Sequence, residues 1–259
     1  DRGDHHAARR LLNRWLERTG DYSGLQVLPF YCAYRAVVRA KVDAIQIYQP
    51  GHTFSDQRHL ANDCRGYLEL AQQYTVRHQP ALLITMGPSG SGKTTVTQRL
   101  IEGTDAIRVR SDVERKRLHG LAPEEHSSPE LKQTMYAAEA TAQTYEHLAD
   151  LATQVIAAGF PVVVEATFLR RAERRRFAEL ADTLGVPFLI IRCAVAPDLL
   201  RTHIRQRQQQ GQDASEADER VLQSQLRSME PPDLREQPSV IAADAGDLTA
   251  AVRLRLSND

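Results

Sequence analysis

The chain has 259 residues, of which 42% are hydrophobic and 25% charged, an ordinary composition for a globular protein. Lysine plus arginine and aspartate plus glutamate both number 33, so no net charge draws the protein to nucleic acid or to an anionic membrane. The three cysteines are widely spaced and form no C-x-x-C pair, which argues against a disulfide framework or a zinc site and favours a reducing cytoplasm. No apolar run approaches the roughly 18 residues of a membrane span. Because the chain begins with Asp and not with Met, we expect a fragment or a processed form.

The first part of the chain, residues 1–79, is predicted to be entirely helical. Apolar periodicity predicts helices over about 4–18, 23–48 and 55–74, and Pro29 can split the second of them. We expect this segment to serve as a helical cap or a docking surface.

The part from residue 80 onward opens with a phosphate-binding motif. Residues 87–94, Gly-Pro-Ser-Gly-Ser-Gly-Lys-Thr, match G-x-x-x-x-G-K-[ST] at every fixed position, between an apolar run at 81–86 and a helical stretch. In such a loop backbone N–H groups cradle phosphates, the lysine reaches the β- and γ-phosphates, and the threonine hydroxyl binds Mg²⁺. ATP and Mg²⁺ are therefore the predicted cofactors. The predicted nucleotide contacts are Gly87, Ser89, Gly90, Ser91, Gly92, Lys93, Thr94 and Thr95.

The rest of this part alternates strands and helices, which predicts a mostly parallel sheet with helices on both faces. The fold class is thus α/β, a P-loop kinase three-layer sandwich over 80–259, preceded by the helical segment 1–79. The further strands are predicted at 106–110, 161–165, 187–193 and 239–243. The further helices are predicted at 113–119, at 170–184, 197–210, 215–229 and 247–256, and as one long helix that ends near 158.

Two charged residues follow the second strand of this sheet. Asp112 lies where an open α/β sheet presents residues to ligand, and its carboxylate could take the proton of an acceptor hydroxyl that attacks the γ-phosphate. The alternative role for Asp112 is to cap the following helix. Arg115, one turn later, could bind an anionic group of the acceptor or a phosphate, or could be a solvated helix residue.

A third acidic residue, Glu165, ends the apolar strand Val162-Val163-Val164. Like a Walker-B acid it could hold Mg²⁺ through a water, or it could bind substrate. The alternatives are a helix cap or a salt-bridged strand end.

Arginines cluster at two places. Those of 170–176 suggest contact with nucleic acid, but Glu173 interrupts them and they surround the helix, which favours a solvated face paired with neighbouring acids. Arg201, Arg205 and Arg207 precede a Gln/Gly-rich stretch and suit a lid that closes over the phosphates. Arg201 and Arg205 are predicted to be catalytic, and Arg207 to bind the nucleotide.

These features together resemble the gluconate-kinase-like P-loop kinases over about residues 81–245. The segment 221–232 is similar to the L-x-S-Q-x-x-x-L-E-x-P stretch of gluconate kinases, with Met229 in place of Leu. The broader group includes polynucleotide kinase, chloramphenicol phosphotransferase and zeta-toxin-like kinases, and the resemblance implies Asp112 as base and Arg115 as a substrate-side residue. Two departures are Glu165, where Asp is commoner, and the loop 119–130, which differs from the substrate region of gluconate kinases.

The first fifty residues resemble the C-terminal end of aminoglycoside-phosphotransferase-like kinase domains, through Thr19-Gly20-Asp21-Tyr22 and the stretches 28–31 and 34–42. The resemblance implies a partner domain upstream. Because the His-Gly-Asp-type catalytic segment of those domains is missing from 1–79, that segment is expected to have no phosphotransferase activity of its own.

The preferred interpretation is a cytoplasmic enzyme that transfers the γ-phosphate of ATP to a hydroxyl of a small molecule. One alternative is a nucleotide-dependent regulatory or binding module that controls a partner domain. Another is a nucleic-acid 5′-hydroxyl kinase, which the even overall charge disfavours.

Overall fold

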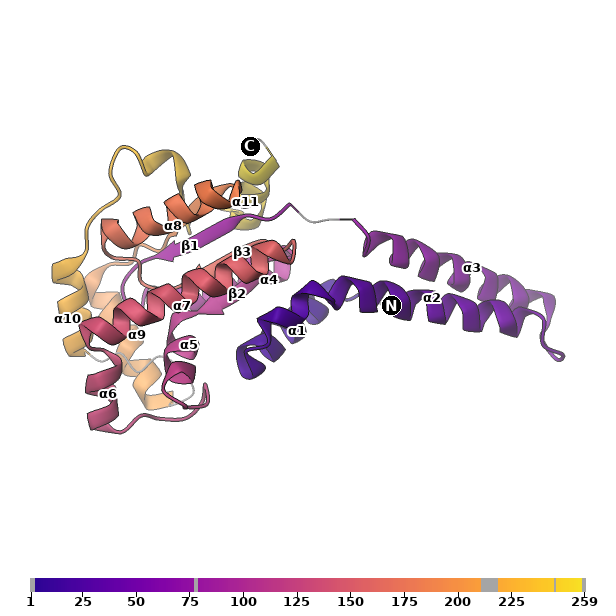
Figure 1. Ribbon diagram of the computed structural model, residues 1–259, viewed down its shortest axis with the longest axis horizontal. Coiled ribbons are helices and arrows are strands. Elements are labelled where there is room, and N and C mark those ends of the chain that lie inside the picture. Colours follow the sequence, from indigo (N-terminus) through magenta and orange to yellow (C-terminus); the bar gives the residue numbers. More distant parts are fainter. Residues whose placement is uncertain (1–2, 77–78, 211–218, 245, 258–259) are drawn as a thin grey trace. The chain divides into compact units, whose positions relative to one another are not determined.

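A computed structural model describes residues 3–76, 79–210, 219–244 and 246–257, and the described chain falls into two compact units (Figure 1). One unit holds the described part of Ser23–His78. The other holds His5–Tyr22 and the described part of Gln79–Asp259. Among the described residues, none of the helices combines the length and the apolar character needed to cross a membrane.

The larger unit is built on a parallel sheet, which confirms the predicted α/β fold. Its described strands lie in the order β2-β3-β1-β4-β5, and every neighbouring pair is parallel. Runs such as Leu82–Met86 and Val162–Glu165 are buried throughout because helices cover both faces of the sheet. The strands are β1 (Leu82–Met86), β2 (Ile107–Arg110), β3 (Val162–Glu165), β4 (Phe188–Arg192) and β5 (Val240–Ala242).

Helices form the outer layers (Figure 1). α4 (Lys93–Gly103) and α11 (Leu248–Ser257) pack together on one side of the sheet, where Leu100, Ile101 and Val252 join the core. α7 (Ala138–Ala157) and α8 (Arg171–Leu184) pack together on the other. The remaining helices of this unit are α1 (His5–Thr19), α5 (Ser111–Leu118), α6 (Pro129–Met135), α9 (Pro197–Gln210) and α10 (Glu219–Ser228).

Helix α1 covers the outer edge of strand β2. The Asn13 side chain accepts a hydrogen bond from the Arg108 backbone N–H at 2.7 Å and donates one to the Ala106 carbonyl at 3.3 Å, as a neighbouring strand would. An edge strand otherwise presents unpaired backbone groups. α1 therefore packs with the α/β unit, whereas the sequence grouped it with the other helices of 1–79. The boundary predicted at 79/80 differs from the packing in this respect.

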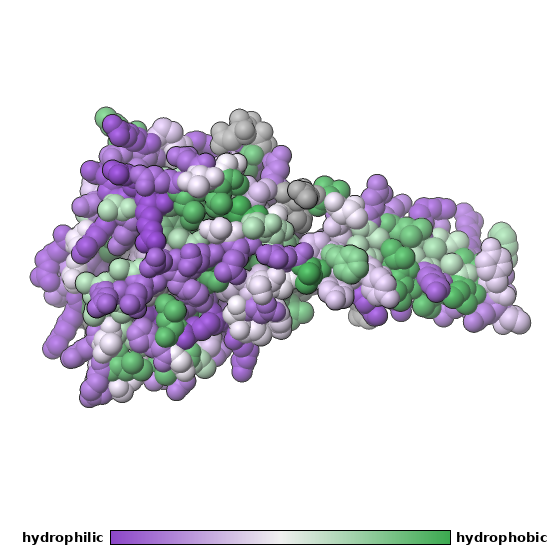
Figure 2. Space-filling model, viewed as in Figure 1, coloured by the Kyte–Doolittle hydropathy of each residue, from purple (hydrophilic) through white to green (hydrophobic). Residues whose placement is uncertain are grey.

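The smaller unit is a pair of long helices, α2 (Leu28–Ile47) and α3 (Phe54–Gln73), which pack along each other after a short 3₁₀ turn, η1 (Tyr22–Gln26). Pro29 lies in the first turn of α2 and so starts this helix without splitting it. Figure 2 shows hydrophobic residues gathered on this unit. Its exposed large apolar side chains include Phe30, Tyr31, Tyr34, Ile45, Tyr48, Phe54 and Leu68.

Candidate functional site

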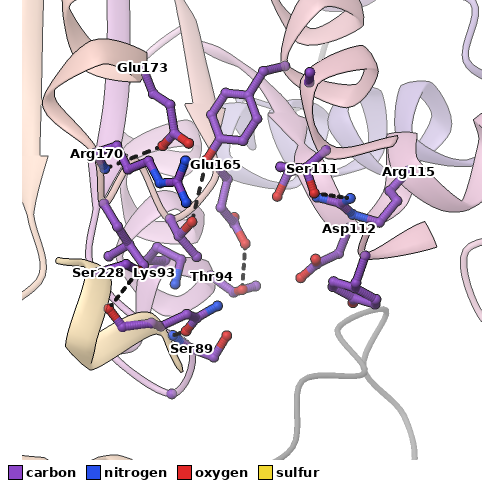
Figure 3. A pocket seen from close by; sticks show the side chains of 18 of the residues that line it. Ser89, Lys93, Thr94, Ser111, Asp112, Arg115, Glu165, Arg170, Glu173 and Ser228 are labelled. Carbon is purple, nitrogen blue, oxygen red and sulfur yellow. Dashed lines mark hydrogen bonds between the residues drawn. The ribbon is translucent and has the colours of Figure 1, made fainter. Parts of the chain in front are cut away.

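A cavity of about 850 Å³ lies where the phosphate-binding loop meets the ends of β2 and β3 (Figure 3). Side chains from distant parts of the sequence reach it, because the carboxyl ends of parallel strands share one edge of a sheet. Of the predicted site residues, those that line the cavity are Ser89, Gly90, Gly92, Lys93, Thr94, Thr95, Asp112, Arg115 and Glu165.

The three glycines of the loop 87–92 give it a conformation that other residues at these positions would disturb. Gly90 and Gly92 have φ of +83° and +80°, in the left-handed region that favours glycine. At Gly87 the reason is a close approach, since a Cβ would lie 2.6 Å from both the Cys193 carbonyl oxygen and the Ser91 Oγ. The loop is thus fitted tightly against the end of β4.

Gly87→Ala is therefore expected to displace the loop and to weaken nucleotide binding at least about tenfold, since several loop amides must point at the phosphates together. Binding of a fluorescent ADP analogue measures this. Gly66→Ala is the matched control, because a Cβ on Gly66 in α3 meets no atom within 4 Å. Unchanged affinity in the Gly87 variant would contradict the tight fit.

Polar contacts hold the loop in place. The Lys93 ammonium donates to the Gly87 and Pro88 carbonyls at 3.0 and 2.8 Å. The backbone N–H of Ser89 donates to the Gln225 side-chain oxygen at 2.8 Å, and His203 Nδ1 lies 2.9 Å from the Gly90 carbonyl. Gln225 belongs to the segment 221–232 that carries the gluconate-kinase resemblance, which gives this segment a place against the nucleotide loop.

Glu165 receives hydrogen bonds from the loop helix. Thr94 Oγ1 donates to one carboxylate oxygen at 2.6 Å and Thr97 Oγ1 to the other at 2.5 Å, while Arg110 Nε lies 3.3 Å away. Burial alone would raise the pKa of Glu165, but Arg110, Arg108 and the two hydroxyls outweigh it and hold this pKa below its ordinary value. Glu165 is therefore a carboxylate at neutral pH.

The pair Thr94 and Glu165 fits Mg²⁺. A hydroxyl and a carboxylate are the hard oxygen donors this ion prefers, and both line the cavity. Protein sites usually hold Mg²⁺ through one or two such groups together with phosphates and water, without a cage of protein ligands. In keeping with this, the described residues contain no cluster of three or more His, Cys, Asp or Glu side chains suited to a metal.

Asp112 is the second residue of α5, and Figure 3 shows its carboxylate in the cavity beside Arg115. The N-cap of this helix is Arg110, without a side-chain cap bond, so the alternative role of Asp112 as cap is wrong. Within the described part of the chain, its carboxylate accepts no hydrogen bond and pairs with no cation. It is thus available to a ligand.

Arg115 is buried beside the cavity and lies at a helix break that the sequence did not predict. Its guanidinium donates to the Met135 carbonyl at 2.7 Å and lies 4.9 Å from the centre of the Tyr136 ring. The single long helix expected to end near 158 is interrupted, as α6 and α7, where Ala137 has an extended backbone, and Arg115 binds the carbonyl of Met135 at the end of α6. The alternative of a solvated helix arginine is wrong.

Two of the predicted lid arginines, Arg201 and Arg205, do not line the cavity. Arg201 pairs with Asp198 at 3.3 Å and lies 3.9 Å from Glu219, and Arg205 lies 3.5 Å from the same Glu219. One helical turn separates the two arginines, so both face α10, whereas His203 faces the loop. The Arg207 side chain lies outside the described residues.

Basic helix α8 supplies the positive charge instead. Arg170 at its N-terminus and Arg176 line the cavity, with Glu173 between them. The other arginines pair with acids, Arg171 with Asp233, Arg174 with Glu236 and Arg175 with Glu179. The sequence predicted a solvated face paired with neighbouring acids: the acid pairs are present, but Arg174 is buried and the cavity contacts of Arg170 and Arg176 were not predicted. The sequence feature that could have indicated a shared role is the spacing of 173 and 176, which places both residues on one side of a helix.

Phe168, a residue with a strained backbone, lies in the turn that contacts the phosphate-binding loop. Phe168 is buried with φ of +44°, rare for a side chain of this size. Its N–H donates to the Tyr145 hydroxyl at 3.2 Å, and its ring packs edge-on against Tyr145 and Phe177. This turn aims the preceding carbonyl, that of Thr167, at the Gly87 N–H at 3.0 Å. The strained turn at 168 thus places the Thr167 carbonyl so that its hydrogen bond joins the end of β3 to the phosphate loop.

Solved structures with this fold include several kinases. A putative kinase from Chloroflexus aurantiacus is 22% identical, covers 69% of this chain and 100% of its own, with a TM-score of 0.52. A sugar kinase from Janibacter is 20% identical, covers 69% and 95%, with a TM-score of 0.50. Kti12 from Chaetomium thermophilum, solved with ADP-AlF3, is 14% identical, covers 68% and 96%, with a TM-score of 0.51. At these identities the likeness concerns the fold, which is that of P-loop kinases.

Sequence relatives and a family model complete the comparison. The uncharacterized proteins Rv2004c of Mycobacterium tuberculosis and Mb2027c of Mycobacterium bovis are each 27% identical over 190 residues, which cover 72% of this chain and 36% of theirs. The chain thus spans about a third of the length of these curated relatives. A family model described as an AAA domain, AAA_33, matches residues 82–232, which is more than half of the chain and includes every residue that lines the cavity. The chain therefore belongs to the AAA_33 family of P-loop domains.

Proposed function

We propose that this protein is an ATP-dependent kinase that transfers the γ-phosphate to a hydroxyl of a small molecule. The observation that carries the proposal is the Asp112 carboxylate, which has no partner among the described residues and lines the same cavity as Lys93 and Thr94. A phosphate-binding loop alone implies a bound triphosphate. A carboxylate available beside it supplies the base that transfer to a hydroxyl needs.

In the proposed reaction Asp112 takes the proton of the acceptor hydroxyl. The acceptor oxygen then bonds to the γ-phosphorus while the bond to the β–γ bridging oxygen breaks, which releases ADP and the phosphorylated acceptor. Lys93 leaves the loop carbonyls and contacts the β- and γ-phosphates. Thr94 and Glu165 would hold Mg²⁺, which neutralises phosphate charge when bound. Arg170 and Arg176 take the charge-stabilising role first expected of the lid arginines.

The acceptor side of the cavity favours a ligand with an anionic group. Arg115, Arg170 and Arg176 contribute three guanidinium groups, and Glu173 contributes one carboxylate. Tyr136 adds an aromatic surface next to Arg115. A small hydroxylated acid or phosphate ester matches these groups, with its hydroxyl toward Asp112 and its anionic group toward the arginines.

The test is a screen of hydroxylated acids and phosphate esters for acceptor-stimulated release of ADP, with Lys93→Ala as the blank. We expect at least one acceptor to raise ADP release about tenfold or more above hydrolysis in the unchanged protein and not in the blank. Acceptor-independent hydrolysis alone, with every compound, would favour the regulatory module.

The other two interpretations are separated by binding experiments. A 5′-hydroxyl nucleic-acid kinase would retain single-stranded DNA or RNA in a strongly salt-dependent manner. The ion pairs of Arg171, Arg174 and Arg175 leave the basic helix with little free charge for this.

The resemblance of residues 1–50 to phosphotransferase-like domains, and a partner domain upstream, remain predictions, since the matched family begins at residue 82.

A further inference from the structure

A line of buried charges connects helix α1 to the candidate magnesium site. Glu17 is 1% exposed, and its Oε1 lies 2.8 Å from Nε and 2.7 Å from Nη2 of Arg108. On its other side the same guanidinium donates to Thr97 Oγ1 at 3.4 Å and lies 3.9 Å from the nearer carboxylate oxygen of Glu165. Arg108 is thus held between a carboxylate of α1 and the carboxylate that faces Thr94.

Further contacts fix α1 in this position. The Asn13 amide is paired with the edge of β2, Arg117 donates to the Glu17 carbonyl, and Arg9 pairs with Asp105 at 2.8 Å. α1 lies far outside the matched range of 82–232. An element from outside the family domain therefore supplies one of the charges around its metal site.

The charges in this group balance. Glu17 and Glu165 carry two negative charges, Arg108 and Arg110 two positive ones, and all four residues are buried. Arg14, 3.7 Å from the other oxygen of Glu17, has a side chain that is 58% exposed and screened by water. Charges so poorly screened by water act on one another strongly, and a change in one alters the field felt by a cation at the next. The effect of Glu17 on a cation beside Thr94 is therefore electrostatic as well as structural.

We propose that Glu17 is a positioning residue of the magnesium site, which acts by compensating the charge of Arg108 beside Glu165. The inference rests on the proposed function, since it concerns the Mg²⁺-bound nucleotide. Without the negative charge of Glu17, Arg108 repels the cation and is freed to move onto the Glu165 carboxylate. Without Arg108, both carboxylates attract the cation.

Substitution of Glu17 and substitution of Arg108 are therefore expected to change Mg²⁺ binding in opposite directions. Glu17→Gln leaves one excess positive charge near the site, and Arg108→Met leaves one excess negative charge. A purely structural ion pair would give the same direction in both variants, since either change breaks it. The double variant restores the balance.

The experiment measures the affinity of a fluorescent ADP analogue in EDTA and in saturating Mg²⁺, and takes the ratio as the Mg²⁺ enhancement. We expect Glu17→Gln to lower the enhancement about five- to tenfold and Arg108→Met to raise it about as much, with the double variant within about twofold of the unchanged protein. Affinity in EDTA is expected to change little or to rise in Glu17→Gln.

Glu102→Gln is the matched control, since it removes a carboxylate that contacts α1 through an ion pair with Arg10, which does not involve Glu17. It should leave the enhancement unchanged. Emission of Trp15, the only tryptophan and a residue of α1, checks that α1 stays docked. Arg108→Met is the decisive variant, because loss of a purely structural ion pair would lower the enhancement in both variants. Changes in the same direction, or none, would overturn the inference, whereas an unchanged protein without any Mg²⁺ enhancement would overturn the magnesium site itself.

Discussion

Asp112→Asn is expected to lower the kcat of acceptor phosphorylation by about 10²- to 10⁴-fold, the usual contribution of a general base. Asparagine keeps the size of the side chain but cannot take up the proton of the acceptor hydroxyl. The affinity for the ADP analogue should stay within about twofold, because Asp112 has no contact with the phosphate loop and its loss breaks no hydrogen bond or ion pair of the described structure. Single-turnover kinetics with the acceptor found in the screen measure the effect.

A matched control distinguishes the base from a general effect of charge. Asp198→Asn removes a carboxylate on α9 that is 94% exposed and that, within the described part of the chain, pairs with Arg201 alone. This variant should phosphorylate the acceptor at the normal rate. If Asp112→Asn does the same, the proposed kinase mechanism is wrong and a nucleotide-dependent switch becomes the better interpretation.

The centre of this site could be predicted because its residues follow strands. Asp112 and Glu165 come just after or at the end of apolar runs, and parallel strands bring such positions to one edge beside the loop that ends in Lys93. The βα alternation follows from the same pattern, whereas the order β2-β3-β1-β4-β5 is seen only in the structure. Local hydrophobic periodicity is strong in buried parallel strands, so this part of the fold is readable from sequence alone.

The parts that could not be predicted depend on contacts across long sequence distances. Asn13 and Glu17 occupy ordinary polar positions of a helix, and nothing local indicates that they face β2 and Arg108. Likewise, the sequence shows that Arg201 and Arg205 share a helix face but not that α10 places Glu219 opposite that face. A charged side chain reveals its role only when its partner is known.

The AAA_33 domain here is thus completed by an element that precedes it. α1 covers the open edge of β2 and contributes Glu17 to the charges around Glu165, while the α2–α3 pair forms a separate unit. We expect that removal of residues 5–22 would expose the β2 edge and leave Arg108 without its buried partner. The compact α/β unit therefore begins at α1 and not at the phosphate-loop strand.

Glu236→Ala is expected to lower the free energy of unfolding of the α/β unit by about 3 kcal/mol, because it strands a fully buried arginine. Arg174 is 0% exposed, and Glu236 accepts from its Nε at 2.6 Å and from its Nη2 at 3.0 Å. Burial favours the neutral acid, but the Arg174 hydrogen bonds outweigh it and hold the pKa of Glu236 below its ordinary value. The contribution of the pair is therefore present above the ordinary glutamate pKa and is lost as the pH falls through the lowered one.

The expected loss of unfolding free energy depends on the hydrogen bonds that Arg174 keeps in the variant. Its Nη1 still donates to the Phe168 and Leu169 carbonyls at 3.0 and 3.2 Å, so the guanidinium is not wholly unpaired, and the lower end of the range for broken buried ion pairs applies. For a unit of this size about 3 kcal/mol corresponds to a fall in Tm of about 6–12 °C.

Glu179→Ala gives the comparison within the same helix. It breaks the exposed pair with Arg175, whose side chains are 77% and 62% exposed, and should cost less than about 0.5 kcal/mol. Urea unfolding followed by Trp15 emission reports on the α/β unit, since α1 belongs to it. Equal losses in the two variants would contradict the buried pair, whereas a large loss at Glu236 alone would show that the pair of Arg174 and Glu236 stabilises the unit.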